Sequence, residues 1–509
     1  MRVSGMDERM KLLPAYLLWL VLPGLLLVRE ANPVWWSSLS VRGLISTAEL
    51  LLCISIWPVI RNQSNPVSAR IILITSLWLG WCLLSTLLSD TMWQGLPRWS
   101  ELVIHCIFLL MLYRYLHTYR QATSILLAAQ LSVLILIMSA LVLTWLSAGS
   151  PRQYNWVNDA PFFNNIRHLG FLAVMIIPLG YYLLEQNKSR FLHVQSLLVL
   201  ITGWTLIFWL GGRGAFISLL ITTLIYLYWY RQRWLLIFTV IVTAALLSQL
   251  FLVNNPSMNL LRLIPMETDK SLNDISSGRL EIYIKAIAYW WKYAPVTGMG
   301  ADHFRFIIPD ILRPHIIQPH SFPVQLLISY GIPGAALACW LGYRFFSYGF
   351  RQSPISNRIL LLPVIAGVLH SITDGVFYHA YSIMLAITFI ALCAGNWPAE
   401  QEPHPLSAGS RWLPSGLSSA AALILVPFLI QIHLSTRSDL SLTTILAVTH
   451  KPLFFRPDEW IASCKEKSDT ACLKLLTDTA VEKTDNPCYY YRLSDNPDSG
   501  RLDYYCHAQ

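Results

Sequence analysis

Charged side chains are scarce in this sequence. Asp, Glu, Lys and Arg make up only 13% of the 509 residues, whereas 55% are hydrophobic. A soluble globular protein carries roughly 25% charged residues, so a soluble enzyme is excluded. Because lipid cannot hydrogen-bond an exposed backbone, apolar stretches of about 20 residues must form helices that satisfy their own amides. The sequence therefore predicts an all-α polytopic membrane protein.

Acidic residues are fewer than basic residues, which gives the chain a formal net charge of +9. The Lys and Arg residues are scattered at the ends of apolar runs and are not interleaved with aromatics along one soluble face, which argues against nucleic-acid binding. A cleavable leader is not indicated either, since the apolar run after residues 1–11 continues without a small-residue cleavage site. We expect this run to be the first membrane span.

Apolar windows of spanning length predict about 13 transmembrane helices. They lie near Leu12 to Val28, Gly43 to Ile60, Ile71 to Leu88, Ser100 to Leu116, Thr123 to Leu146, Leu169 to Leu184, Leu192 to Leu210, Ala215 to Tyr230, Leu235 to Val253, Ser321 to Phe346, Ile359 to Val376, Tyr381 to Ala394 and Leu413 to His433.

Basic residues in the short loops predict the orientation of these spans. Those on one side are Arg61, Arg70, Arg114, Arg120, Lys188, Arg190, Arg231, Arg233, Arg351 and Arg358. By the positive-inside rule this side is the cytoplasm, and the N-terminus lies in it. Residues 149–168, 254–320 and 435–509 then face the periplasm of a bacterial inner membrane. The predicted domains are a transmembrane domain over 1–434, which includes the large loop 254–320, and a small periplasmic segment over 435–509.

The nine cysteines fall into two groups. Those within predicted spans are Cys53, Cys82, Cys106, Cys339 and Cys393, where a free thiol packs as a small hydrophobe. The others, Cys464, Cys472, Cys488 and Cys506, form an even set in the short C-terminal segment. An oxidising compartment favours two disulfides there over a metal site, and all three pairings stay open.

An arginine flanked by glycines lies between two predicted spans, in the run Gly211-Gly212-Arg213-Gly214-Ala215. It is either an arginine that snorkels to the interface or a functional group. The glycines favour function, because they let a ligand or backbone approach closely. A guanidinium is a planar fork of donors suited to phosphate oxygens.

The large loop contains a second candidate, Arg279, at the start of a run with helical spacing of apolar residues up to Trp290 and Trp291. The spacing predicts an amphipathic helix near the membrane surface, with Ser277 as its cap. Arg279 in the first turn opposes the helix dipole, so it is either a solvated surface residue or paired with an anionic group.

The third candidate is His320, within Pro319-His320-Ser321 and just before the span that contains Gly331-Ile332-Pro333-Gly334. A histidine here is either a structural residue at a helix start or a catalyst. The flanking Pro and Ser predict a defined helix entry, which would hold the imidazole rigidly, as a general base requires.

Residues 277–334 resemble the signature region of the O-antigen ligase and polymerase superfamily, which also includes bacterial protein O-oligosaccharyltransferases. His320-Ser321 followed by Gly331-x-x-Gly334 is the most similar part. Ser277-Gly278-Arg279 and Pro295 to Gly300 resemble the segments that come before it in the family pattern. Gly211 to Ala215 resembles the earlier Arg-Gly element of the family. Two positions depart from the family pattern: Ile217 stands where some ligases have Leu, and Ser321 where Asn is frequent.

The resemblance implies a type C glycosyltransferase-like fold and an inverting transfer of a glycan from undecaprenyl diphosphate to an acceptor hydroxyl at the periplasmic face. It assigns Arg213 and Arg279 to the donor diphosphate and His320 to activation of the acceptor, with no metal and no cofactor. The leading interpretation is an O-antigen ligase of lipopolysaccharide biosynthesis, whose acceptor is lipid A core. A protein O-oligosaccharyltransferase or an O-antigen polymerase stays open as the alternative.

Further residues are candidates for substrate contacts, namely Arg167, His168, His315 and Asp374. Glu101 with His105, and His370 with Asp374, stand four apart on one helical face, where mutual hydrogen bonding is favoured over a metal pair. The rival class is a lipid-glycan flippase, which should show an internal repeat with matching broken helices. We find no such repeat in the sequence.

The predicted orientation can be tested with reporter fusions. Because the basic loops place the N-terminus in the cytoplasm and about 13 spans place the C-terminus outside, alkaline phosphatase fused to the C-terminus should be active. Fluorescence from a cytoplasmic reporter at the same position, together with an inactive phosphatase, would reverse the orientation.

Overall fold

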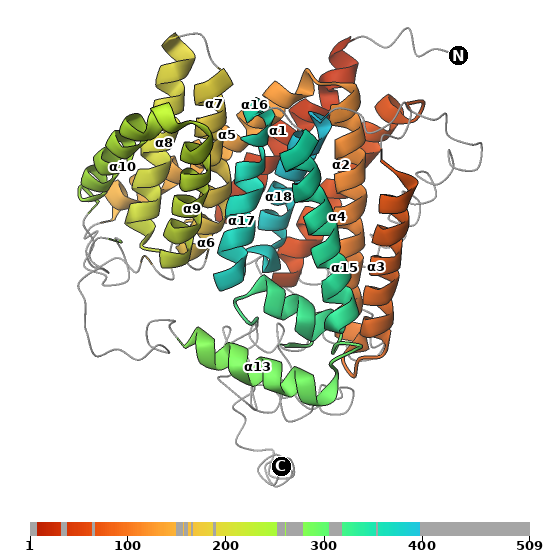
Figure 1. The fold of residues 1–509 in the computed structure, drawn as a ribbon. Coiled ribbons are helices and arrows are strands. Elements are labelled where there is room, and N and C mark those ends of the chain that lie inside the picture. The colour runs from red at the N-terminus through yellow and green to blue at the C-terminus, as the bar shows by residue number, and fades with distance from the viewer. Residues whose placement is uncertain are drawn as a thin grey trace.

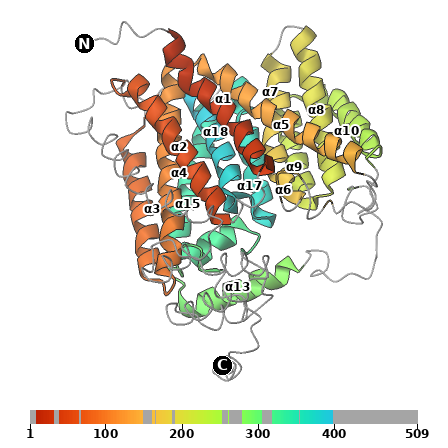
Figure 2. The same ribbon diagram turned by 180° about the vertical axis from the view of Figure 1, so that it is seen from behind.

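The computed structural model describes residues 8–31, 38–63, 67–148, 156, 161–163, 166–186, 190–251, 260, 278–304, 318–352 and 355–397. Every regular element in these ranges is a helix (Figures 1 and 2). The predicted all-α class is therefore confirmed for the described residues. The predicted span Leu413 to His433, His315 and the four cysteines of the C-terminal segment lie outside them.

The helices follow the predicted spans closely. In chain order they are α1 (Glu8–Ala31), α2 (Ser38–Ile60), α3 (Ala69–Leu87), α4 (Met92–Thr118), α5 (Ala122–Ser147), α6 (Arg167–Ile176), α7 (Pro178–Gln186), α8 (Arg190–Leu210), α9 (Arg213–Trp229), α10 (Trp234–Ser248), α13 (Arg279–Tyr293), α15 (Phe322–Gln352), α16 (Ile355–Arg358), α17 (Leu361–Thr373) and α18 (Ala380–Gly395), with short 3-10 helices η2 (Arg231–Arg233) and η4 (Val376–Tyr378).

Length and composition qualify eight of the described helical stretches as candidate membrane spans, and four shorter apolar helices accompany them. Large apolar side chains point outward from these helices. Leu51, Ile135 and Leu246, for example, are 59%, 65% and 68% exposed. Such surfaces would be unfavourable in water and suit a lipid environment.

Helix α17 holds a central place in the bundle. It contacts α6, α9, α15 and α18, and Figures 1 and 2 show it between the group α7 to α10 and the group α2 to α4. Helix α13 lies across one end of the bundle in both views. This arrangement brings the end of α17 close to the loop helix that the sequence predicts at the membrane surface.

Two predicted spans are interrupted. Leu169 to Leu184 is divided into α6 and α7 at Pro178, which has no N–H to continue the hydrogen-bond ladder. The span Ser321 to Phe346 continues as α15, but Gly331 within it has φ 65° and ψ −172°, which breaks the helix. That backbone conformation is strained for any residue with a side chain.

The turn 295–300 fills the break at Gly331. Met299 N–H donates to Ile328 O at 2.8 Å, Gly300 N–H to Ser329 O at 2.9 Å, and Ile332 N–H to Pro295 O at 3.1 Å. Side chains of α3 also bond carbonyls at the break: Ser85 Oγ donates to Ser329 O at 2.7 Å, and Trp81 Nε1 donates to Tyr330 O at 2.8 Å. The backbone groups freed by the break are thus satisfied, as burial requires.

Replacing Gly331 with Ala should destabilise the protein strongly. A Cβ at this position would meet Val296 O at 2.0 Å, so the turn or α15 must shift, at a cost of about 3 kcal/mol. Thermal unfolding in detergent measures the effect. Gly342→Ala is the matched control, since Gly342 lies in the same helix with nothing within 4 Å of a Cβ. Equal melting temperatures for the two variants would contradict this account.

Candidate functional site

Asp374 lies at the point where α17 ends. Its backbone is extended, with φ −150° and ψ 170°, while its N–H still donates to His370 O at 3.0 Å. The following Gly375 N–H donates to Asp374 Oδ1 at 2.9 Å. The carboxylate is held at the end of the bundle that α13 crosses, and the residue is only 8% exposed.

Arg279 reaches this carboxylate from the first residue of α13. Its Nη2 lies 3.0 Å from Asp374 Oδ2, and its Nη1 donates to Thr373 O. The expectation that Arg279 is paired with an anionic group is therefore confirmed. The predicted cap is different, because Gly278 occupies the N-cap position with φ 79° and the helix has no side-chain cap there; Ser277 itself is outside the described residues.

His320 approaches the other oxygen of the same carboxylate. Its Nδ1 lies 3.3 Å from Asp374 Oδ1, and the side chain is 32% exposed. The residue has φ 53° just before α15 begins, and its carbonyl accepts a hydrogen bond from Tyr283 Oη at 2.9 Å. A carboxylate only accepts, so Nδ1 carries the proton and Nε2 is left as the basic nitrogen.

Asp374 stays ionised at physiological pH. Burial acts to raise the pKa of its carboxyl, but the hydrogen bond from His320 and the charge of Arg279 outweigh burial and hold the pKa well below its usual range. The ionised carboxylate therefore stabilises the fold at any pH above the ordinary carboxyl pKa. That contribution falls progressively as the pH drops from the ordinary carboxyl pKa through the lowered pKa of Asp374.

Two further arginines begin helices beside this pair. Arg213 is the first residue of α9, and Gly214 lets α9 approach the end of α17: a Cβ there would lie 2.8 Å from Thr373 Oγ1. Arg167 is the first residue of α6 and interacts electrostatically with Arg279, Asp374 and Arg213. Positive charge thus exceeds negative charge in this region, which favours an anionic ligand.

The predicted contact residue His168 packs in an aromatic group beside this site. Its ring centroid lies 4.3 Å from that of His379 and 5.0 Å from that of Phe171, which in turn lies 5.2 Å from the ring of His370. His370 is buried, and its Nδ1 has no hydrogen-bond partner among the described residues. A metal-binding group of three or more His, Cys, Asp or Glu side chains is not found in the described part of the chain.

The expected mutual pairing of residues four apart is wrong in both cases. Glu101 is bonded by Arg98 at 2.5 Å, while His105 Nδ1 pairs with Glu49 at 2.7 Å. Asp374 bonds Arg279 and His320, not the side chain of His370, because α17 ends before Asp374 and turns its carboxylate away from the helix face.

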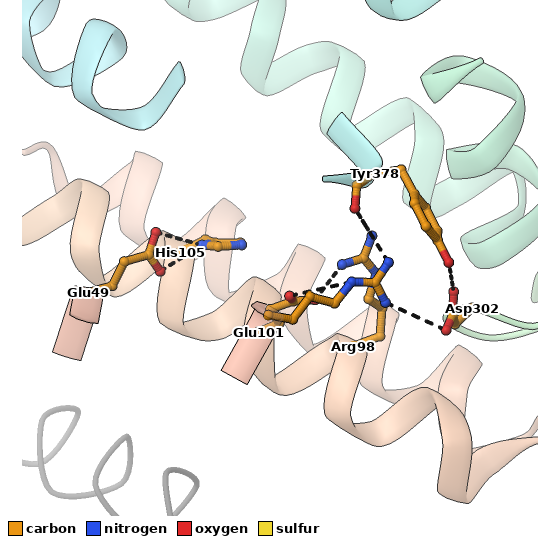
Figure 3. A network of polar contacts seen from close by, with 7 residues as sticks. Glu49, Arg98, Glu101, His105, Asp302 and Tyr378 are labelled. Carbon is orange, nitrogen blue, oxygen red and sulfur yellow. Dashed lines mark hydrogen bonds and ion pairs between the residues drawn. The ribbon is translucent and has the colours of Figure 1, made fainter. Parts of the chain in front are cut away.

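A buried charged network anchors the segment that follows Asp374 (Figure 3). Arg98 Nη2 donates to Tyr378 O at 2.7 Å, and the guanidiniums of Arg42 and Arg98 lie 4.4 and 4.7 Å from the centroid of the Tyr378 ring. Tyr378 Oη donates to Asp302 Oδ1 at 2.9 Å. Helices α2 and α4 and the turn after α13 therefore hold Tyr378, and with it the chain after Asp374.

Sequence reasoning did not single out this network. The available signal was Glu101 inside an apolar span, where a charge is costly and needs a partner, with Arg98 three residues before it. Arg42, Asp302 and Tyr378 are distant in sequence, and no local spacing connects them to that pair.

The fold and the site together define a polytopic helical membrane protein with a cation-rich polar site at one end of its bundle. A family model described as O-antigen ligase matches residues 197–339, from α8 into α15. This match confirms the resemblance to the O-antigen ligase and polymerase superfamily. It includes Arg213, Arg279 and His320, while Arg167 and Asp374 lie outside it. No curated protein matches the chain.

Removing the charge of Glu101 should destabilise the protein, because Arg98 and Arg42 would lose a buried anionic partner. For Glu101→Gln we expect a loss of about 3 kcal/mol, as for other broken buried ion pairs. Thermal unfolding in detergent measures it. The control Glu281→Gln removes an exposed pair with Lys285 and should change stability by about 0.5 kcal/mol or less. Similar losses for both variants would show that the network contributes no more than a surface pair.

Proposed function

We propose that this protein is an inverting glycosyltransferase of the O-antigen ligase type, which transfers a glycan from undecaprenyl diphosphate to an acceptor hydroxyl at the periplasmic face of the bacterial inner membrane. The match to the O-antigen ligase family supports this class of activity. The observation that supports the mechanism most directly is the Asp374 carboxylate bonded to both Arg279 and His320.

The arginines are assigned to the leaving diphosphate. Departure of the glycan leaves additional negative charge on the phosphate oxygens, and charge-assisted hydrogen bonds strengthen as that charge develops. Arg213 and Arg279 begin α9 and α13, so their backbones are fixed by helices that pack on the bundle. Arg167 adds a third positive charge in the same field.

His320 is assigned as the general base. Its Nε2 takes the proton of the acceptor hydroxyl while the acceptor oxygen bonds to the anomeric carbon and the bond to the diphosphate breaks. Attack opposite the leaving group inverts the anomeric centre. Asp374 accepts from Nδ1–H and so fixes the tautomer and orientation of the ring, and it stabilises the imidazolium that forms.

Asp374 also couples the two halves of the reaction. One of its oxygens bonds a donor-binding arginine and the other the base. One carboxylate does not neutralise three arginines, so a net positive charge remains for the diphosphate. The carboxylate also keeps Arg279 at the end of α17. His168 and His315 stay proposals for sugar or phosphate contacts.

Lipid A core is the proposed acceptor, with a protein or a growing glycan as the alternative acceptor for the same donor chemistry. A flippase is disfavoured because alternating access typically uses an internal repeat with matching broken helices, and we find no such repeat in the sequence. The C-terminal segment 435–509, with its two proposed disulfides, is assigned to the same periplasmic side.

The assigned roles predict separate effects on chemistry and binding. His320→Ala should lower the transfer rate by about 10²- to 10⁴-fold with donor binding nearly unchanged, because a base acts on the acceptor. Asp374→Asn should also lower the rate, since it loses the charge that stabilises the imidazolium. Arg213→Lys should weaken donor binding, because Lys lacks the bidentate fork. The assay is transfer from purified undecaprenyl diphosphate glycan to a supplied acceptor, with donor binding measured separately.

Matched controls lie at the ends of α8 and α9 that are remote from Arg213. His193→Ala is on α8 near its first residue, and Arg231→Lys lies just beyond the last residue of α9; both should behave as the unmodified protein. Near-normal transfer by His320→Ala would rule out its role as base. Loss of donor binding in that variant would instead assign His320 to the diphosphate site.

A further inference from the structure

A cavity of about 340 Å³ opens between α3, α4, α15 and α18, away from the site described above. Each of three helices contributes the half that is remote from the site. Helix α3 contributes the part from Ile71 to Leu79 and α15 the part from Leu341 to Tyr348. Helix α18 contributes Ile390 and Ala394, and Trp397 follows just beyond its end. Helix α3 alone is 19 residues long, and at 1.5 Å per residue its two ends are about 28 Å apart.

The wall of the cavity is apolar and lies within candidate membrane spans. Side chains such as Ile72, Ile107, Leu110 and Phe345 form it, and they are only partly covered by the protein, apart from the buried Ile107. The volume falls in the range of small-molecule sites in proteins. At this depth in a bilayer the available apolar occupant is a hydrocarbon chain.

One arginine lines the cavity, and a second lies over the same aromatic ring as the first. Arg344 lines it, and the guanidiniums of Arg344 and Arg70 lie 5.8 and 5.9 Å from the centroid of the same ring, Trp340. Both side chains are exposed. No Asp or Glu is among the residues that line the cavity, so its charge is positive and suits an anionic headgroup.

We propose that this cavity binds an anionic glycerophospholipid of the cytoplasmic leaflet, with an acyl chain against the apolar wall and the phosphate at Arg344 and Arg70. The basic loops predict the cytoplasm on this side, where anionic lipids and basic pockets between spanning helices meet. The isoprenoid donor does not fit this position, because its diphosphate belongs to the arginines at the opposite end of the bundle. The inference is independent of the transfer reaction.

Binding here would stabilise the association of α3 with α15. The same α3 donates Trp78 Nε1 to Gly334 O at 3.0 Å and Ser85 Oγ to Ser329 O at 2.7 Å, on both sides of the break in α15. A lipid that fills the cavity would contact the other halves of both helices and add to the contacts that already join them, such as Arg70 over Trp340. Any ligand that binds only the folded state raises stability in this way.

The test is lipid binding to the delipidated, full-length protein in a neutral detergent, measured by native mass spectrometry. The probes are phosphatidylglycerol, which is anionic, and phosphatidylcholine, which has no net charge. The unmodified protein should bind phosphatidylglycerol more tightly. Each of Arg70→Gln and Arg344→Gln should weaken that binding about fivefold, since one basic side chain near a lipid surface contributes about that factor.

A charge control and a volume control separate the possible outcomes. Arg231→Gln removes another arginine that lies over an aromatic ring, 5.7 Å from the Tyr228 centroid, and lines no part of the cavity; it should have no effect. Ser76→Trp places a large side chain in the cavity wall and should weaken binding of both lipids.

Equal affinity of the unmodified protein for the two lipids would overturn the proposal. So would unchanged phosphatidylglycerol binding in both Arg70→Gln and Arg344→Gln. If the predicted span Leu413 to His433 fills the cavity instead, none of these variants changes lipid binding, and the proposal is wrong.

Discussion

The buried carboxylate of Asp374 is the interaction on which the proposed site depends. It ends α17, the central helix of the bundle, and receives Arg279 from α13 and His320 from the start of α15. A buried anion needs partners, and here the partners are the groups that the proposed chemistry requires. The cost of burying the charge is offset by bonds that place a phosphate-binding group and a base beside each other.

Two structural devices keep that carboxylate and its partners in position. The turn 295–300 is locked into the break at Gly331, so the first half of α15, which follows His320, is tied to the chain that follows α13. On the other side, Tyr378 is held by Arg42, Arg98 and Asp302 only a few residues after Asp374. Both devices use buried polar contacts inside an apolar bundle, where they are strong because water does not compete.

The two ends of the bundle differ in chemistry. One end has Arg279 bonded to the Asp374 carboxylate, with Arg167 and Arg213 nearby, and the other has Arg344 in the wall of an apolar cavity, with Arg70 over the same Trp340 ring. The first arrangement suits a diphosphate that leaves during a reaction, because the cations are fixed by helix starts and by a partly buried anion. The second suits a lipid headgroup, because exposed side chains can adapt to a bilayer surface.

Sequence alone determined the helical class, most of the span positions and the helix α13, and it singled out Arg213, Arg279 and His320, whose roles stay proposals. These follow from local properties: apolar length, helical spacing and short motifs. Tertiary structure alone decided the partners. Spacing along one helix predicted that Glu101 would bond His105 and Asp374 would bond His370, yet Glu101 bonds Arg98, His105 bonds Glu49 and Asp374 bonds groups more than 50 residues away. A buried charge selects its partner from every helix that packs around it, and which helices those are is fixed only when the chain has folded.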